Sequence, residues 1–279
     1  MQIDTKKGLT SQIIEKAKEF GACAAGIADV EALKQSPSHL IYPQIGGYKS
    51  FLNNEVPRDS GEVLWPTYAR SAIVVAVEHP EDKPELDWWQ DELKGGTPGN
   101  RLLIKIISGL TEWLREDIGC EARGLPYYIV QGGIFLKDAA VMAGLGCIGK
   151  NNMLVTPGYG PRVRLRAALL DIKLAATGPS DFDPCPDCHV PCRKACPQKA
   201  FGKKIRIDNP LGVNELPGRT GVYSRPLCKD QMELDKENAN RIANENTHGS
   251  TMIVKCCRLC ETTCPIAAVG RQFSTRSGR

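Results

Sequence analysis

The sequence lacks several features that would place it in a membrane or export class. No apolar run approaches the roughly 18 residues that a membrane helix needs, and the longest is Ala72–Val77. The start, Met1–Gly8, is polar and has neither the charged-then-apolar order of a secretory signal nor a twin-arginine export signature. No internal repeat occurs apart from two cysteine motifs. We therefore expect a cytoplasmic protein without a membrane span.

The sequence contains enough apolar residues for a core, and their spacing is helical in some segments and strand-like in others. The chain has 279 residues, of which 42% are hydrophobic and 24% charged, so one large or two moderate domains are expected. The expected elements are a helix over 9–20, a strand over 24–28, a loop-rich stretch over 36–70, a strand over 72–77, a helix over 102–114, a brief strand over 127–130, a helix over 135–142, and one or two strands over 163–174. This mixture predicts an α/β or α+β domain over 1–178. Gly178–Ser180 would form the hinge into a cysteine-rich module over 179–279.

Twelve cysteines dominate the chemistry of the chain. In a reducing compartment cysteines serve as metal ligands more often than they form disulfides. Cys23, Cys120 and Cys147 are scattered, whereas the other nine fall between Cys185 and Cys264. This distribution points to a metal-binding C-terminal segment.

The clustered cysteines form two motifs, CPDCHVPCRKACP over 185–197 and CRLCETTCP over 257–265, with Cys228 between them. A [4Fe–4S] cluster needs four thiolates, and in two-cluster ferredoxins the cysteine before proline ligates the other cluster. Applied here, the rule gives cluster one Cys185, Cys188, Cys192 and Cys264. Cluster two would receive Cys196, Cys228, Cys257 and Cys260.

Three points stay open in this assignment. The first motif has three residues between its second and third cysteines, where the bacterial ferredoxin run has two. Cys256 adjoins Cys257, and the spacing alone favours Cys257. Zinc also accepts paired CxxC units, but it has no use for crossed Cys-Pro ligation and would need two separate four-cysteine sites.

Charge is uneven along the chain. Residues 185–279 carry sixteen Lys or Arg against nine Asp or Glu, so the remainder is net acidic in a chain of total charge +4. A basic segment could receive an acidic redox partner or a nucleic acid. We favour the simpler interpretation that it offsets anionic iron–sulfur thiolate clusters.

A glycine-rich segment, AGLGCIGKNN over 143–152, precedes the cysteines. Its glycines would allow the backbone to approach a bulky ligand closely. The segment follows a helix instead of starting one, so neither a dinucleotide fingerprint nor a P-loop fits. A structural turn and a ligand site are equally compatible with the pattern.

The segment AGLGCIGKN, the following TPGYGPRVRL over 156–165 and the two cysteine motifs together resemble the epoxyqueuosine reductase and reductive dehalogenase superfamily. FGACAAGIA over 20–28 and the AIVVAV strand are also similar. The resemblance implies a nitroreductase-like α+β core, a ferredoxin-like module with two [4Fe–4S] clusters, and cobalamin bound base-off between them. The chain has no D-x-H-x-x-G loop, so no histidine would ligate the cobalt. The resemblance implies these cofactor-binding residues: Gly144, Gly146, Cys147, Gly149, Lys150, Asn151, Arg162 and Arg164.

The chain also departs from this family. The acid that serves the queuosine enzymes as proton donor, fourteen residues before the first glycine, corresponds here to Val130. A tryptophan common between the second and third glycines is Cys147. The chain ends fifteen residues after Cys264, where those enzymes continue, so we expect a compact member of the family. Its catalytic residues are unknown; Tyr127 and Tyr128 could donate a proton, although packing beside a strand suits them better.

Three functions remain. The first is a cobalamin-dependent reductase in which the two clusters pass electrons to a corrinoid that reduces a small or nucleoside substrate. The second is an iron–sulfur electron-transfer protein that reduces or carries a corrinoid for a partner enzyme, such as a corrinoid protein. A plain ferredoxin fused to an inert or flavin-binding domain is a third. All need a low-potential electron donor such as a ferredoxin or flavodoxin. tRNA is an unlikely partner, since the basic tail over 271–279 lacks the aromatic residues of single-strand binders.

Overall fold

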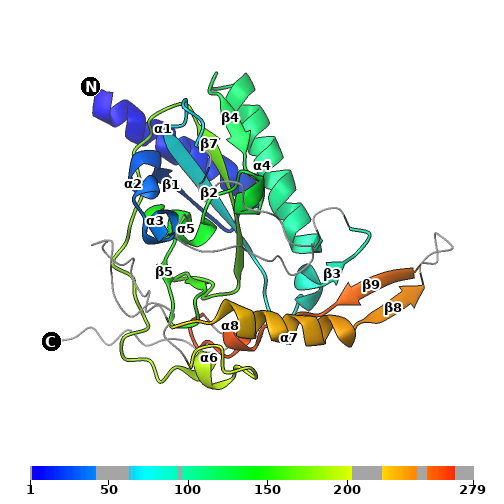
Figure 1. Cartoon of the computed structure of the whole chain (residues 1–279). Helices are drawn as coiled ribbons and strands as arrows, with labels where there is room; N and C mark the ends of the chain where they lie inside the picture. The colour runs from blue at the N-terminus through cyan, green and yellow to red at the C-terminus, as the bar shows by residue number, and fades with distance from the viewer. Residues whose placement is uncertain are drawn as a thin grey trace.

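The fold is built around a four-stranded antiparallel sheet in the order β1-β2-β7-β4 (Figure 1). The computed structural model describes residues 2–41, 63, 65–93, 96–202, 222–243 and 250–267. The strands are β1 (Ala24–Asp29), β2 (Ser71–Glu78), β7 (Val163–Leu170) and β4 (Ala122–Gly124). The register places Ile73 of β2 opposite Ile27 of β1 and Ala168 of β7. The predicted α/β class is confirmed.

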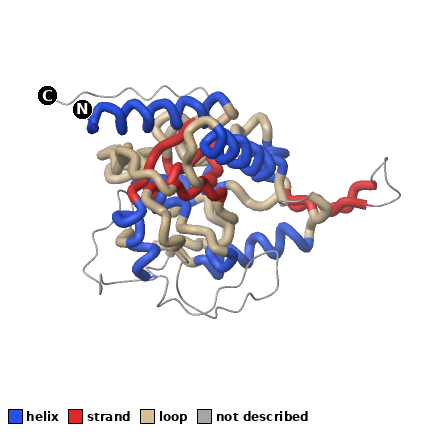
Figure 2. The backbone as a smooth tube through the Cα atoms, turned by 90° about the horizontal axis from the view of Figure 1, so that it is seen from above, coloured by secondary structure: helices blue, strands red, loops and turns tan. Residues whose placement is uncertain are grey.

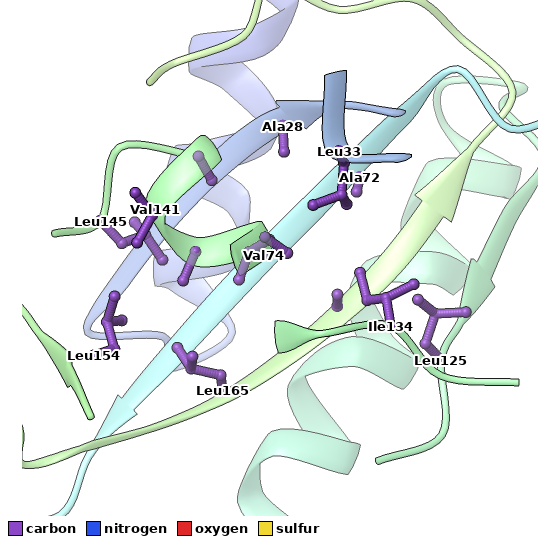
Figure 3. Close-up of a cluster of buried hydrophobic side chains, with 14 of the residues drawn as sticks. Ala28, Leu33, Ala72, Val74, Leu125, Ile134, Val141, Leu145, Leu154 and Leu165 are labelled. Carbon is purple, nitrogen blue, oxygen red and sulfur yellow. The ribbon is translucent and has the colours of Figure 1, made fainter. Parts of the chain in front are cut away.

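Helices cover both faces of this sheet. One face packs against α1 (Gln2–Glu19) and α4 (Pro98–Glu116). The other packs against α2 (Val30–Lys34) and α5 (Leu136–Met142), and Figure 3 shows α5 lying across β1 and β2 with Val141 directed at the strands. In the described part of the chain, no helix is both long and apolar enough to cross a membrane.

The sequence of β2 is apolar throughout because neither of its faces meets water. Ile73, Val75 and Val77 pack towards α1 and α4, while Ala72, Val74 and Ala76 pack towards α5. Successive side chains of a strand point to opposite faces, so burial on both sides removes the usual alternation of apolar and polar residues. Each buried Val or Ile stabilises the fold by about 1.5–3 kcal/mol relative to exposure.

The predicted elements are present with one exception. Instead of a strand over 127–130, the chain makes a short 3₁₀ helix, η3 (Ile129–Gln131). Gly132 adopts a left-handed φ of 95° and the Gly133 amide donates to the Tyr128 carbonyl, which closes a turn there. The strand that completes the sheet edge is β4, which the sequence did not predict. The predicted strand 163–174 is a single strand, β7.

The C-terminal part contributes α6 (Pro191–Lys194), α7 (Arg225–Glu237), β8 (Asn240–Ala243), β9 (Ser250–Val254) and α8 (Leu259–Thr262). Both views show β8 and β9 projecting away from the central sheet (Figures 1 and 2). After η2 (Pro84–Asp87), β3 (Trp89–Gln90) pairs with β9. One small sheet therefore combines residues from both predicted domains, and the boundary at 178/179 stays a prediction.

The expected hinge at Gly178 is packed against the central sheet. The Thr177 hydroxyl accepts from the Ile27 amide at 2.8 Å and donates to the Ala143 carbonyl at 2.7 Å. Gly144, with φ of 75°, ends α5, and a Cβ there would lie 2.5 Å from the Thr177 carbonyl oxygen. Residues 177–178 are therefore fixed to β1 and to the end of α5. The loop-rich stretch predicted over 36–70 begins with α3 (Pro37–Ile41), and 42–62 and 64 lie outside the described residues.

A buried chain of polar groups ties α3 to α5. The Phe135 amide donates to His39 Nε2 at 3.2 Å, which leaves the ring proton on Nδ1, 2.8 Å from the Ser36 hydroxyl. Ser36 in turn donates to Asp138, which also accepts from the amide and hydroxyl of Ser38. Burial lowers the pKa of His39 to about 4, against the opposing effect of Asp138. The imidazole is therefore held neutral.

This neutral histidine predicts a pH dependence of stability. The unfolded chain takes up a proton at His39 below about pH 6.5, whereas the folded protein takes it up only near pH 4. Stability is full above pH 6.5 and falls as the pH decreases towards 4, by on the order of 3 kcal/mol. Urea unfolding of the parent and of His39→Gln between pH 7.5 and 4 measures this. The stability difference between the two should shrink on acidification, and parallel curves would contradict the prediction.

Candidate metal centre

Four cysteines from two distant motifs line one pocket: Cys185, Cys188, Cys192 and Cys264. The first three are brought together locally, because the Cys188 amide donates to the Cys185 carbonyl and Pro191 starts α6 immediately before Cys192. Cys264 follows α8, which contacts α6. The grouping is the one that the Cys-Pro rule predicts for cluster one.

A second group contains the remaining predicted ligands. The pKa of the Cys260 thiol is raised to about 12 by burial and then by the nearby groups Cys228, Cys257, Glu261 and Cys196. Cys228 lies on α7 and Cys260 on α8. Cys196 follows α6, where its sulfur accepts from the Ala200 amide at 3.3 Å. The structure thus brings together all four residues predicted for cluster two.

The adjacent thiols Cys256 and Cys257 share most of their charged neighbours. After burial, Asp235 and Cys228 raise the pKa of each. Asp87 acts in addition on Cys256, whose pKa is raised to about 12, and Cys196 acts on Cys257. The choice of Cys257 as the ligand therefore stays a prediction from the motif spacing.

The four thiols of the first group line a common pocket. Across the described ranges, no three His, Cys, Asp or Glu side chains form a group that could hold a single metal ion. A [4Fe–4S] cluster binds one thiolate at each iron, so its four ligands are spread around the cluster. The four-cysteine pocket has the donor set that such a cluster requires.

Cys185 differs electrostatically from the other thiols. A hydrogen bond from Cys147 lowers its pKa to about 6, helped by the Lys150 amide and ammonium and opposed by burial and Asp183. The Lys150 amide lies 3.5 Å from the Cys185 sulfur. By contrast, burial and Cys264 raise the pKa of Cys192 to about 11. The Cys147 thiol and Lys150 thus favour the thiolate form of Cys185.

Arg162 fixes the chain around Cys264. Its guanidinium donates to the carbonyls of Thr262, Cys264 and Ile266 at 3.0, 3.2 and 3.1 Å and to Glu81 at 2.7 Å. The residue is only 2% exposed. Three carbonyls converging on one planar cation fix the peptide that carries Cys264.

Arg164 belongs to a second buried charge network, which reaches α8. It contacts Asp87 and Glu261 at 2.8 Å each. Arg258 contacts the same two carboxylates and donates to the His79 carbonyl. Although burial opposes it, the pKa of Asp87 is lowered by a hydrogen bond from His79 and by the two arginines. The CxxC loop of the second motif, which contains Arg258, is therefore anchored to η2 and β7.

The glycine-rich segment also faces the cysteines. Lys150 Nζ donates to the Pro186 carbonyl, and Asn151, 3% exposed, donates to the Cys260 carbonyl. A Cβ on Gly146 would lie 2.1 Å from the Val155 carbonyl oxygen, and one on Gly149 would lie 3.4 Å from the Cys185 sulfur. The space beside these glycines is filled by the chain itself, as the structural-turn alternative predicts.

Six of the eight residues predicted to bind a cofactor lie along the contact with the cysteine-bearing segment, whereas Gly144 and Gly146 face Thr177 and Val155. Their contact with a corrinoid stays a prediction. Sequence reasoning missed Asp183, Arg258 and Glu261, which hold the two motifs in place. The signal in the sequence that could have identified these three residues is their position inside or directly beside the cysteine motifs. Tyr127 is 52% exposed and packs edge-to-face on Tyr128.

Comparison with known proteins supports one superfamily. No protein-family model matches the chain. It is 28% identical over 265 residues to an epoxyqueuosine reductase of Gloeobacter violaceus, covering 91% of this chain and 75% of that protein. It is 40% identical over 146 residues to a tetrachloroethene reductive dehalogenase of Desulfitobacterium hafniense, covering 49% of this chain and 25% of that protein.

A solved structure of epoxyqueuosine reductase with an epoxyqueuosine-modified tRNA stem loop shares the fold, with a TM-score of 0.59 at 20% identity. The alignment covers 93% of this chain and 65% of that chain, so the present chain spans just under two thirds of that enzyme. The chain therefore aligns with proteins of both groups. It resembles epoxyqueuosine reductases and reductive dehalogenases, which are oxidoreductases, in sequence, and it shares their fold.

Proposed function

We propose that the protein is an iron–sulfur reductase whose two [4Fe–4S] clusters carry electrons to a bound corrinoid. The observation that supports it best is the pocket lined by Cys185, Cys188, Cys192 and Cys264, which joins the first motif to the last cysteine of the second. Cluster two takes Cys196, Cys228, Cys257 and Cys260. The domains are a nitroreductase-like core over 1–178 and a ferredoxin-like module over 179–279.

The corrinoid part of the proposal is supported by the resemblance to epoxyqueuosine reductases and reductive dehalogenases. A corrinoid, when bound, would supply a low-valent cobalt that acts as nucleophile or reductant. The polar groups of Lys150, Asn151, Arg162 and Arg164 are bonded to the cysteine-bearing segment, so these side chains hold that segment in place. Base-off binding without a histidine ligand remains part of the proposal.

The substrate class is a small molecule or a nucleoside. One relative was solved with a modified tRNA stem loop, which makes tRNA a plausible partner despite the opposite expectation from the sequence. The basic tail over 271–279 lies outside the described residues. A low-potential ferredoxin or flavodoxin supplies the electrons. An alternative is an electron-transfer protein that reduces or carries a corrinoid for a partner enzyme, which the missing acid at position 130 favours.

Cofactor content is the first test of this proposal. Anaerobic purification after growth with cobalamin should give about eight irons and one cobalt per chain, with a base-off Co(II) signal in the EPR spectrum. Iron, cobalt and acid-labile sulfide are quantified in the same sample. Eight irons without cobalt, even after reconstitution with cobalamin, would exclude the corrinoid-dependent reductase and leave an iron–sulfur electron-transfer protein. Zinc in place of iron would contradict both functions.

The two adjacent cysteines provide a matched pair of variants. Cys257→Ala should lose about four irons, since the motif spacing selects its thiol as the ligand and Cys196 lies near it, whereas Cys256→Ala should keep all eight. Iron analysis and EPR of the reduced proteins measure the difference. The reverse pattern would assign Cys256 as the ligand.

The contacts of Arg162 predict that its substitution removes iron from cluster one alone. In Arg162→Lys a compact ammonium cannot reproduce the donors that hold three carbonyls and Glu81, so the Cys264 peptide should loosen and about four irons should be lost. Arg166→Lys is the control, because Arg166 lies on β7, which Arg162 directly precedes, but bonds to Leu125 and Asn100. Equal iron content in the two variants would show that Arg162 does not position the cluster.

A further inference from the structure

A strained backbone position lies inside the first cysteine motif. Val190 has φ of 52° and ψ of 50°, which is the left-handed region. Residues other than glycine seldom adopt this region, and a β-branched residue there is an outlier. Pro191 follows, and the residue before a proline is biased towards extended backbone. A conformation that breaks two local preferences persists only where the surrounding structure imposes it.

The motif spacing explains the turn at Val190 but not its side chain. Three residues separate Cys188 from Cys192, where the bacterial ferredoxin run has two. The Val190 carbonyl accepts from the Arg193 and Lys194 amides at 3.1 and 3.3 Å, so α6 begins directly after the left-handed residue. Glycine would make the same turn without strain. The presence of a valine side chain therefore needs a reason of its own.

Val190 lies between the four-cysteine pocket and the exposed part of the loop. Of the three residues between Cys188 and Cys192, Val190 alone lines the pocket. Asp187 and His189, on either side of Cys188, are exposed, whereas Val190 is half-buried. Its side chain is therefore the apolar part of the pocket wall that lies next to solvent on the Cys188 side.

Apolar side chains from other elements also line this pocket. Val155, on β6 (Leu154–Val155), and Ile266 belong to the lining and pack with Cys264. β6 pairs with β5 (Cys147–Ile148), which fixes the position of Val155. A buried water needs two to four polar partners, which such side chains do not supply. The wall therefore disfavours water beside the thiolates.

Two residues of the lining carry an ammonium or an amide. Lys150 donates to the Pro186 carbonyl, and Asn151 donates to the Cys260 carbonyl. Both side chains thus direct their donors at peptide groups. The apolar side chains consequently decide how closely water approaches the cysteines.

From this placement we propose that Val190 shields cluster one from water and thereby lowers the reduction potential of that cluster. The inference rests on the proposed function, since it requires a cluster held by the four cysteines of the pocket. The step concerned is the uptake of one electron, with no bond formed or broken. Water stabilises the more negative, reduced cluster more than the oxidised one, so its exclusion lowers the potential. The reduced cluster is then a stronger reductant for its acceptor.

Lys199 provides a control for backbone strain. Its φ is 51°, and its amide donates to the Cys196 carbonyl at 3.1 Å, beside the proposed cluster two. The residue is exposed and does not line the pocket of cluster one. Lys199→Gly therefore relieves a comparable strain without removing a side chain from the wall of that pocket.

The test is a redox titration followed by EPR on the anaerobic holoprotein and three variants. Val190→Gly removes both the side chain and the strain, whereas Val190→Ala removes most of the side chain and keeps the strain. Both should raise one cluster potential. In V190G the ratio of oxidised to reduced cluster should fall about tenfold at a fixed poise, or about 59 mV. Lys199→Gly should leave that potential unchanged. In deuterated water, the deuterium modulation of the reduced cluster signal should increase in both Val190 variants.

The outcomes separate shielding from strain. A potential that shifts in V190G alone would assign the effect to backbone strain and overturn the inference, as would unchanged potentials in both Val190 variants. An equal shift in K199G would also overturn it. If V190G alone loses about four irons, V190A decides, since a raised potential supports shielding and an unchanged one contradicts it.

Loss of about four irons from both Val190 variants would overturn the inference in favour of a role in cluster assembly. Absence of cluster signals from the parent protein would defeat the proposed function itself, which distinguishes that failure from a failure of this inference.

Discussion

The arrangement of the cysteines depends on holding the α8 segment against the central sheet. Cys264 is more than seventy residues from Cys192 in sequence, so its place in the shared pocket is set by tertiary contacts and not by motif spacing. Arg162 provides these contacts at the start of β7 by binding three carbonyls around Cys264. A strand buried on both faces is a rigid support for such a clamp, because its position is fixed by packing along its length.

The same junction buries several charges, which is costly unless each is paired. Arg164, Arg258, Asp87 and Glu261 alternate in sign, and each positive group contacts both negative ones. Removing one member would leave a buried charge uncompensated, at a cost of about 3–5 kcal/mol. Such a network does little for net stability but strongly disfavours other placements of the second motif. The geometry of the second cysteine group thus depends on η2 and β7, although neither contributes a ligand.

The sequence predicts the elements of the fold where burial imposes a periodic pattern of apolar residues. The stripe along α4 and the apolar run of β2 follow directly from the faces that they bury. The sequence did not predict the turn at Tyr127–Gln131, because the apolar residues there have the pattern of a strand. The geometry of the turn depends on Gly132 and Gly133. The two cysteine groups were predicted residue by residue, since cluster ligation constrains spacing. Asp183, Arg258 and Glu261 were missed because their roles come from distant partners that no local pattern encodes.

The glycine-rich segment explains why spacing alone could not separate a turn from a ligand site. Its glycines permit close backbone approach in either case, and the structure shows that the approach is to Val155, Thr177 and the Cys185 sulfur. The side chain between the second and third of these glycines, Cys147, packs against Val155, Cys264 and Ile266. With cysteine at position 147, that place holds a small, polarisable side chain. The segment that the sequence suggests as a cofactor-binding turn is thus also a support of the cysteine-bearing segment.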